Sequence, residues 1–190
     1  MPIYNRMRAA DYATRFALLR NPVFADDSAS HGGGGDCTNF ISQALFYGGW
    51  EMIHGIKWDR TVWYTEALDH TRRHRSFTWA GAEPFSNFLR VSGRARKCSY
   101  SDLFIGDLVQ ATLHDQVDHT MMVTRVSGTG PTKTVFLSYH SRDSLNKPYR
   151  DVVSTYSGNS GVNFIFWKIR DWYASTTGVT FELNVPSLRL

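Results

Sequence analysis

The stretch Gly32–Gly49, which reads GGGGDCTNFISQALFYGG, constrains the fold more than any other part of the sequence. A four-glycine run leads to Asp36 and Cys37, and apolar residues then recur at helical spacing as far as Gly48. Asp36 is a favourable N-cap residue, and paired glycines commonly follow the end of a helix. The pattern therefore predicts a buried helix of about three turns with Cys37 in its first turn.

A cysteine at the start of a helix is well placed to act as a nucleophile. The thiolate is the reactive form, and the partial positive charge of a helix N-terminus lowers the pKa of a thiol. The backbone N–H of Cys37 could hold an oxyanion together with one further donor, and Asn39 and Gln43 are near in sequence. Because buried cysteines are also common as packing residues, a cysteine hydrolase is predicted only if a histidine comes from elsewhere in the fold.

Seven histidines could supply that general base. His119 opens a segment with the composition of a strand, which is a rigid position from which an imidazole can reach a helix N-terminus. Position alone therefore favours His119. His140 ends another strand-like segment, and the remaining five histidines lie in polar, turn-like or glycine-rich segments: His31, His54, His70, His74 and His114.

A third group must hold the tautomer of the imidazole and stabilise the imidazolium. The candidates are His140 and Asp143, of which Asp143 has the more suitable charge. Asp118 is adjacent to His119 in the chain. Because successive side chains of a strand point to opposite faces, we expect Asp118 to point away from the site.

The residues around Cys37 resemble those of a known family. The segment Gly-Asp-Cys-Thr-Asn-Phe-Ile-Ser-Gln, followed by Gly-Gly, is similar to the nucleophile motif of the putative amidase domain family of bacteria. That family is similar in turn to papain-like cell-wall amidases and NlpC-type endopeptidases. The resemblance covers roughly residues 4–150, and the other similar blocks are Tyr4–Arg6, Ala10–Ala13, Ile105–Gln110, Asp118–His119 and Tyr139–Asp143.

This resemblance implies a papain-like (NlpC-type) fold and a cysteine mechanism with no metal or organic cofactor. It supports His119, because papain-like amidases carry the base at the start of a strand after the helical half. It favours His140 over Asp143 as the third catalytic residue, because NlpC-type enzymes use a polar residue at the matching position. Papain-like enzymes often place a polar donor before the nucleophile helix. Asp36 stands there, and since a carboxylate cannot donate, we assign it to capping and to recognition of a substrate amine.

Hydrophobic periodicity places helices in the first half of the chain and strands in the second, which is typical of an α+β domain. At 190 residues the chain is most simply one domain, 1–190, with a core at about 4–170 and a C-terminal extension at 171–190. We expect the nucleophile helix to pack on an antiparallel sheet whose second strand is covered on both faces. The predicted helices are 4–19, 37 to about 47 and 82–91. The predicted strands are 108–113, 119–126, 134–139 and 162–169. The predicted loops include 94–97 and 141–160, and 179–185 is predicted to be an edge strand or tail.

Charge and hydropathy narrow the function classes. The net charge of +4 suits a polyanionic partner but selects none, and we expect no nucleic acid among the partners. No stretch is long and apolar enough to span a membrane. The first twenty residues lack the apolar core of a cleaved signal. We therefore expect a chain made in the cytoplasm without a cleaved signal and exported to act in the cell wall or periplasm of a target cell.

Three other patterns suggest a disulfide, a phosphate-binding loop and a zinc site, and the residues around them argue against each. Two cysteines, Cys37 and Cys98, are too few for a disulfide framework. A disulfide between them is an alternative, and it would inactivate the site because Cys37 would no longer be a free thiol. The glycine run is not followed by the Lys-Ser/Thr of a phosphate-binding loop. His70 and His74 have helical metal-ligand spacing but lack the glutamate of a zinc motif, so we expect no metal ion.

These observations predict a cysteine amidase that cuts the peptide stem of bacterial peptidoglycan through a thioester. It would act as an antibacterial effector or a phage lysin, and in the effector case a cognate immunity protein would be its partner. Aromatic residues after the nucleophile helix, Trp50 among them, could stack on the substrate. The alternatives are a cysteine protease, deamidase or transglutaminase that acts on a protein, and a binding module that keeps the fold without catalysis.

Overall fold

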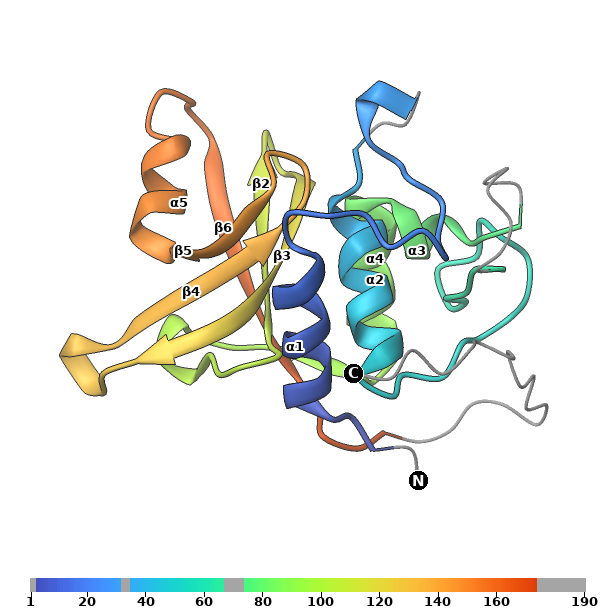
Figure 1. Ribbon diagram of the computed structural model, residues 1–190, viewed down its shortest axis with the longest axis horizontal. Helices are drawn as coiled ribbons and strands as arrows, with labels where there is room; N and C mark the ends of the chain where they lie inside the picture. Colours follow the sequence, from blue (N-terminus) through green and yellow to red (C-terminus); the bar gives the residue numbers. More distant parts are fainter. Residues whose placement is uncertain (1–2, 32–34, 67–73, 174–190) are drawn as a thin grey trace.

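A single antiparallel sheet organises the part of the chain that the structure describes (Figure 1). The computed structural model describes residues 3–31, 35–66 and 74–173. The strands lie in the order β1-β6-β2-β3-β4-β5, so β6, the last strand of the described residues, inserts between β1 and β2. Their bounds are β1 Ala95–Lys97, β2 Leu108–Leu113, β3 Gln116–Ser127, β4 Thr134–Tyr139, β5 Ser144–Pro148 and β6 Val162–Ile169. The helices are α1 Arg6–Phe16, α2 Cys37–Tyr47, α3 Phe77–Ala80, α4 Ala82–Val91 and α5 Tyr149–Thr155.

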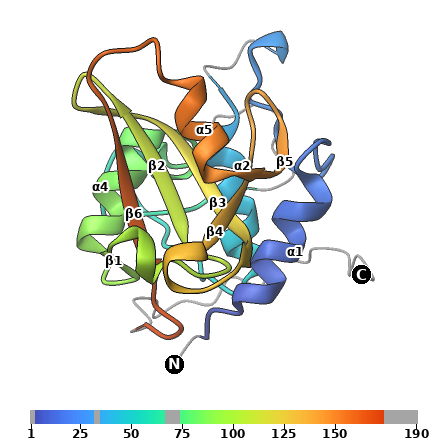
Figure 2. The ribbon, with the colours of Figure 1, turned by 90° about the vertical axis from the view of Figure 1, so that its left-hand side faces the viewer.

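Helices cover both faces of this sheet. α1, α2 and α4 pack on one face against β3, whereas α5 lies on the other side beside β4 and β5 (Figure 1, Figure 2). Alternation along β2 matches these layers, because Leu108 belongs to the core under the helices and Val109 to the core on the opposite face. Met122 and Met121 of β3 divide in the same way. The α+β class and a strand covered on both faces are therefore confirmed.

The central helix α2 is the most deeply placed element. Every residue from Cys37 to Leu45 is buried. The helix ends at Tyr47 and Gly48 is its C-cap, where a Cβ would meet the Tyr4 ring at 2.7 Å. The next residue, Gly49, has a left-handed φ of +101°. Both positions need glycine, so the paired glycines mark the helix end for a physical reason. The predicted bounds of this helix are confirmed.

The first helix is shorter than its apolar pattern predicts. It begins at Arg6, where the side chain of Asn5 accepts a hydrogen bond from the backbone N–H of Arg8, and it ends at Phe16. Such a cap fixes a start that periodicity alone does not locate. The predicted helix 82–91 and the predicted strands 108–113, 134–139 and 162–169 are confirmed.

Two segments expected to be loops contain regular structure instead. Residues 141–160 contain β5 and α5, and α5 buries only Val152, so neither element has a clear apolar periodicity. The basic segment 94–97 contains β1, which pairs with β6 and exposes Arg96 and Lys97. Charged side chains are common on edge strands, because they discourage pairing with another chain. The predicted strand or tail at 179–185 lies outside the described residues.

Candidate active site

Cys37 is the first residue of α2, where the helix packs against β3. Its side chain lies almost out of reach of solvent, with the residue 8% exposed, and its sulfur lies 3.7 Å from Thr38 Oγ1. Thr38 Oγ1 lies 2.9 Å from Thr120 Oγ1 on β3. The start of the predicted nucleophile helix is thus attached to the strand that carries His119.

His119 shares a pocket with Cys37. The pocket has a volume of about 350 Å³ and lies between the start of α2, one end of the sheet and α5. The His119 ring contacts Tyr139 edge to face, with ring centroids 5.0 Å apart. The structure therefore brings the predicted nucleophile and the predicted base together. The pocket is lined by Gly35, Cys37, Leu113, Asp118, His119, Tyr139, Ser141, Arg142, Lys147, Thr155, Tyr156 and Asn159.

Burial sets the protonation states of both groups. Loss of water around the thiol raises the pKa of Cys37 above its ordinary value, although hydrogen bonds from Thr120 and Thr38 act to lower it. Burial first, and the charge of Arg142 second, lower the pKa of His119 to about 4. At neutral pH the site therefore holds a thiol and a neutral imidazole that can accept its proton. Helix position alone predicts a lowered thiol pKa, and here the burial of the thiolate outweighs it.

Asp118 also lines the pocket, so the expectation that it points away from the site is wrong. The reason is a bulge in the pairing of β2 with β3. His119 lies opposite Ala111 and Val117 lies opposite Thr112, which leaves Asp118 without a partner residue on β2. An extra residue of this kind interrupts the alternation of side chains along a strand. Asp118 and His119 therefore reach the same cavity.

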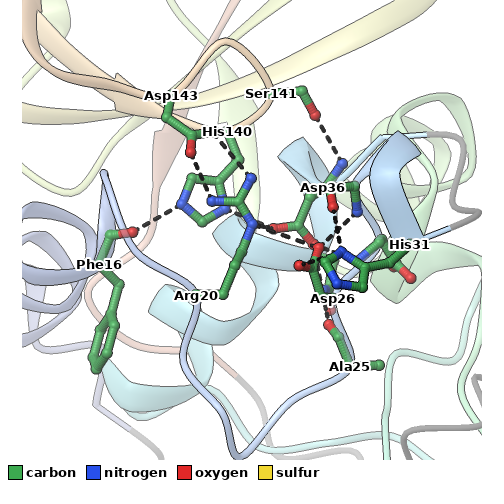
Figure 3. A network of polar contacts seen from close by, with 12 residues as sticks. Phe16, Arg20, Ala25, Asp26, His31, Asp36, His140, Ser141 and Asp143 are labelled. Atoms are coloured by element: carbon green, nitrogen blue, oxygen red, sulfur yellow. Dashed lines mark hydrogen bonds and ion pairs between the residues drawn. The ribbon is translucent and has the colours of Figure 1, made fainter.

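His140 lies beside the start of α2 but is not among the residues that line the pocket. Its Nδ1 lies 2.6 Å from Asp36 Oδ2, and its Nε2 lies 2.8 Å from the carbonyl oxygen of Phe16 (Figure 3). The ring also stacks on Phe40, with centroids 3.9 Å apart. Both ring nitrogens therefore face acceptors inside the protein. Within the described residues, no hydrogen bond joins His140 to His119, so the geometry does not support His140 as the group that orients the base.

Asp36 is the centre of the buried network around His140. It is 1% exposed, and Oδ1 accepts hydrogen bonds from the backbone N–H of Asp27 at 3.1 Å and from Asn39 Nδ2 at 2.7 Å. Oδ2 lies 3.0 Å from Arg20 Nε, and the side chain makes no capping bond to the helix. The assignment of Asp36 to capping and to recognition of a substrate amine is therefore contradicted, because the carboxylate is enclosed and already has partners.

Asp143, the alternative third residue, belongs to the same network. Its two carboxylate oxygens accept hydrogen bonds from the Arg20 guanidinium at 2.8 and 3.0 Å (Figure 3). Arg20 thus bridges Asp143 and Asp36. Among the described residues, neither Asp143 nor any other side chain forms a hydrogen bond with His119.

Three more residues predicted to lie near the substrate are buried instead. Trp50 is 1% exposed and packs in the core under the helices against Trp63, with ring centroids 5.4 Å apart, so it cannot stack on a substrate. Asn39 is engaged with Asp36, and Gln43 accepts a hydrogen bond from Tyr12 at 2.6 Å. Neither side chain lines the pocket, so neither is placed to donate to an oxyanion there.

The turn between β4 and β5 divides its side chains between the pocket and the buried network. His140 and Asp143 join the network, whereas Ser141 and Arg142 line the pocket. Ser141 Oγ accepts a hydrogen bond from the backbone N–H of Asp36 at 3.0 Å, and Arg142 has a left-handed φ of +65°. Neither Ser141 nor Arg142 was predicted as a pocket residue, because the direction of each side chain depends on the backbone conformation of the turn. Their position next to His140 was the only sequence feature that pointed to them.

The remaining sequence predictions concern other parts of the chain. Cys37 and Cys98 are both free, so the alternative of a disulfide between them is wrong. His70 lies outside the described residues, and His74 Nδ1 lies 2.7 Å from Glu66 Oε2. Within residues 3–31, 35–66 and 74–173, no helix has the length and apolar character needed to cross a membrane.

Comparisons with known proteins identify a matching family model and a similar bacterial protein. A family model described as "Putative amidase domain" matches residues 3–167, a range that includes α2, most of the sheet and the pocket residues Cys37 and His119. The chain is also similar to a Bacillus subtilis (strain 168) protein named "Uncharacterized protein YjcM", with 27% identity over 175 residues. That match covers 85% of this chain and 37% of the relative, so the chain spans well under half of the relative's length. No solved structure matches the chain.

Proposed function

This chain belongs to the putative amidase domain family, and from that premise we propose that it is a cysteine-dependent amidase of the peptide stem of bacterial peptidoglycan. The observation that carries the proposal is the shared pocket, in which Cys37 at the N-terminus of α2 meets His119 on β3. A cysteine on a helix start that faces a histidine on an antiparallel sheet resembles the papain-like arrangement, and a papain-like, NlpC-type fold is part of the proposal.

The proposed reaction proceeds in two halves. In the first half, His119 accepts the proton of the Cys37 thiol as the sulfur attacks the carbonyl carbon of the amide. His119 then donates that proton to the leaving nitrogen, the C–N bond breaks, and a thioester stays on Cys37. In the second half, a water molecule loses a proton to His119 and attacks the thioester, which releases the acid and restores the thiol.

The groups around the reacting pair fit the charges that this reaction develops. The first N–H groups of a helix have no partner within it, so those at the start of α2 are the natural donors to the oxyanion. Ser141 lies against the backbone N–H of Asp36 and lines the pocket, and we assign its hydroxyl as the second donor.

The charges of the pocket support a stem peptide as the substrate, because the pocket and such a peptide both carry charges of both signs. Asp118 is anionic, and Arg142 and Lys147 are cationic. A stem peptide presents free amines and free carboxylates close to its amide bonds. With this substrate the protein would act on the wall of a target cell, as an antibacterial effector or a lysin. In the effector case, a cognate immunity protein would cover the pocket.

Digestion of purified peptidoglycan sacculi tests this function. The wild-type protein and Cys37→Ala are incubated with sacculi, and the products are separated and weighed by mass spectrometry. Cys98→Ala is the matched control, because Cys98 is a free cysteine that does not line the pocket. We expect new peptide fragments from the wild type and Cys98→Ala alone, with masses that identify the cleaved bond.

Two outcomes would contradict the proposal. Equal products from wild type and Cys37→Ala would exclude the cysteine mechanism. Unchanged sacculi, together with a mass shift that corresponds to deamidation or cleavage in a protein incubated with the wild type, would move the activity to a protein substrate.

A further inference from the structure

Two cationic side chains of the pocket have no anionic partner among the described residues. Arg142, in the turn after β4, and Lys147, on β5, both line the pocket, and the side chain of neither forms an ion pair or a hydrogen bond with a described residue. On the other side of the same turn, Arg20 is held by Asp143 at 2.8 Å. Arg20 is therefore paired with a carboxylate of the turn, whereas Arg142 and Lys147 at the pocket have no such partner among the described residues.

The backbone at Arg142 indicates that its direction is imposed by the fold. Its φ of +65° lies in the left-handed region, which side chains with a Cβ rarely adopt. Residues held in this region cluster at ligand sites, where the surrounding structure maintains them against their preference. Here the conformation places Ser141 and Arg142 toward the pocket, while His140 contacts Asp36 and Asp143 contacts Arg20 on the other side of the turn.

The guanidinium of Arg142 is also close enough to influence the base. Its positive charge is the second cause, after burial, of the lowered pKa of His119. An imidazolium on His119 is required halfway through the proposed reaction, and Arg142 opposes it. An anion bound to Arg142 would offset that repulsion, so an anionic group on the substrate would improve catalysis as well as binding.

We propose that Arg142 and Lys147 form a carboxylate-binding subsite beside Cys37, so that preferred substrates carry a free carboxylate on a residue next to the cleaved amide. This inference rests on the proposed amidase function. A guanidinium presents two parallel N–H groups to a carboxylate, and an ammonium adds a point charge. Asp118 lines the same pocket and repels a carboxylate, so Arg142 and Lys147 are the groups there that would bind it. Two carboxylates have this chemistry, the C-terminal one and one left free inside a peptide by a side-chain amide link.

A matched set of synthetic peptides distinguishes these two sources. The probes are alanyl-γ-glutamyl-lysyl-alanine with both carboxylates free, with the glutamyl α-carboxylate amidated, with the C-terminus amidated, and with both amidated. The proteins are wild type, Arg142→Gln, Lys147→Gln and Arg8→Gln. Arg8 is an exposed cation on α1 that does not line the pocket, so its variant controls for net charge.

We expect wild type to cleave the preferred acid with a kcat/KM about 10- to 100-fold above that for its amide, as for hydrogen bonds to charged groups. Arg142→Gln should bring that ratio close to one, Lys147→Gln should lower it in part, and Arg8→Gln should keep it. The amidation that removes the preference in wild type identifies which carboxylate the subsite binds.

The pH profile separates this role from a merely structural one. The titratable or charged groups that line the pocket around His119 are Cys37, Asp118, Tyr139, Arg142, Lys147 and Tyr156. Removal of the Arg142 charge raises the pKa of His119, so the acid limb of kcat/KM should move to higher pH in Arg142→Gln. A variant that only loosened the turn would lower the rate without moving this limb.

Binding to Cys37→Ala, measured by calorimetry, makes the subsite testable without turnover. Preferential binding of the acid peptide, lost when Arg142→Gln is added, is the expected result. Equal cleavage and equal binding of acid and amide forms would overturn the subsite and leave the amidase intact. Preferential binding with no cleavage of any peptide by wild type would instead overturn the amidase function and leave the subsite.

Discussion

Thr38 and Thr120 are hydrogen bonded through their hydroxyls, 2.9 Å apart, and each directly follows one of the two residues that we propose to react. Both side chains are fully buried. Gln110 Nε2 donates to Thr120 Oγ1 at 3.2 Å, and Trp167 Nε1 donates to Gln110 Oε1 at 2.8 Å. A buried chain of polar groups thus runs from the nucleophile helix across β3 and β2 to β6. We infer that it fixes the position of Cys37 relative to His119.

The first prediction removes the hydroxyl at the centre of this chain. Thr120→Val should lower the free energy of unfolding by about 1–3 kcal/mol, because Thr38 and Gln110 are left buried without their partner. It should also lower the amidase rate at temperatures where the variant is fully folded. Urea denaturation and peptide release from sacculi measure the two effects.

Thr124→Val is the matched control for that prediction. Thr124 lies on the same strand, and its hydroxyl bonds to Ser138 and Asn146 rather than to the nucleophile helix. It should change stability without a specific loss of rate. Equal rates in the two valine variants would show that the Thr38–Thr120 bond does not position the reacting pair.

A second prediction concerns the resting state of the thiol. Burial raises the pKa of Cys37 and lowers that of His119, so the folded protein should hold a neutral pair rather than a thiolate and an imidazolium. In Cys98→Ala, the rate of alkylation by iodoacetamide should therefore be slow at neutral pH and rise about tenfold per pH unit above it. Cys37→Ala in the same background shows that the label reports on Cys37. A rate that is high and constant from about pH 5 to about pH 8 would instead reveal a preformed ion pair.

A third prediction follows from the same histidine and concerns stability. The pKa of His119 is about 4 in the folded protein and about 6.5 in an unfolded chain, so between these values only the unfolded state holds the proton. The free energy of unfolding should therefore fall as the pH drops through this window, by about 3 kcal/mol from this group. Above the window His119 is neutral in both states and contributes no such loss.

Comparison with His119→Gln isolates that contribution. Urea denaturation at several pH values gives the stability of both proteins, and the variant should lose less stability on acidification than wild type. Parallel pH curves would mean that His119 is not buried as a neutral group.

Elements with a strong apolar pattern could be predicted from the sequence. Side-chain directions that depend on a bulge or on a left-handed turn residue could not. The bounds of α2 followed from helical spacing between Asp36 and the paired glycines, and the pairing of Cys37 with His119 followed from their positions at a helix start and on a strand. The inward turn of Asp118 could not be predicted, because it depends on a bulge and not on residue type. The division of His140 and Arg142 between two sites depends on one left-handed residue in a turn. Burial of Trp50 depends on packing between elements that are distant in the chain.

The last prediction tests the role of His140. Its imidazole links the carbonyl oxygen of Phe16, the last residue of α1, to the carboxylate of Asp36, just before α2. His140→Ala should lower the free energy of unfolding by about 3–5 kcal/mol, because it removes one buried partner of the Asp36 carboxylate and opens a space beside Phe40. Asp143→Asn, which disturbs the more exposed pair with Arg20, should cost about 1 kcal/mol or less.

The same two variants decide whether His140 takes part in catalysis. Because His140 does not line the pocket, folded His140→Ala at low temperature should keep the wild-type pH dependence of Cys37 alkylation. Its amidase rate should fall only as far as the position of α2 is disturbed, and tight binding of the acid peptide should persist. A variant of full stability with no activity would contradict this account, since a residue that only joins α1 to α2 cannot abolish the reaction without weakening the fold.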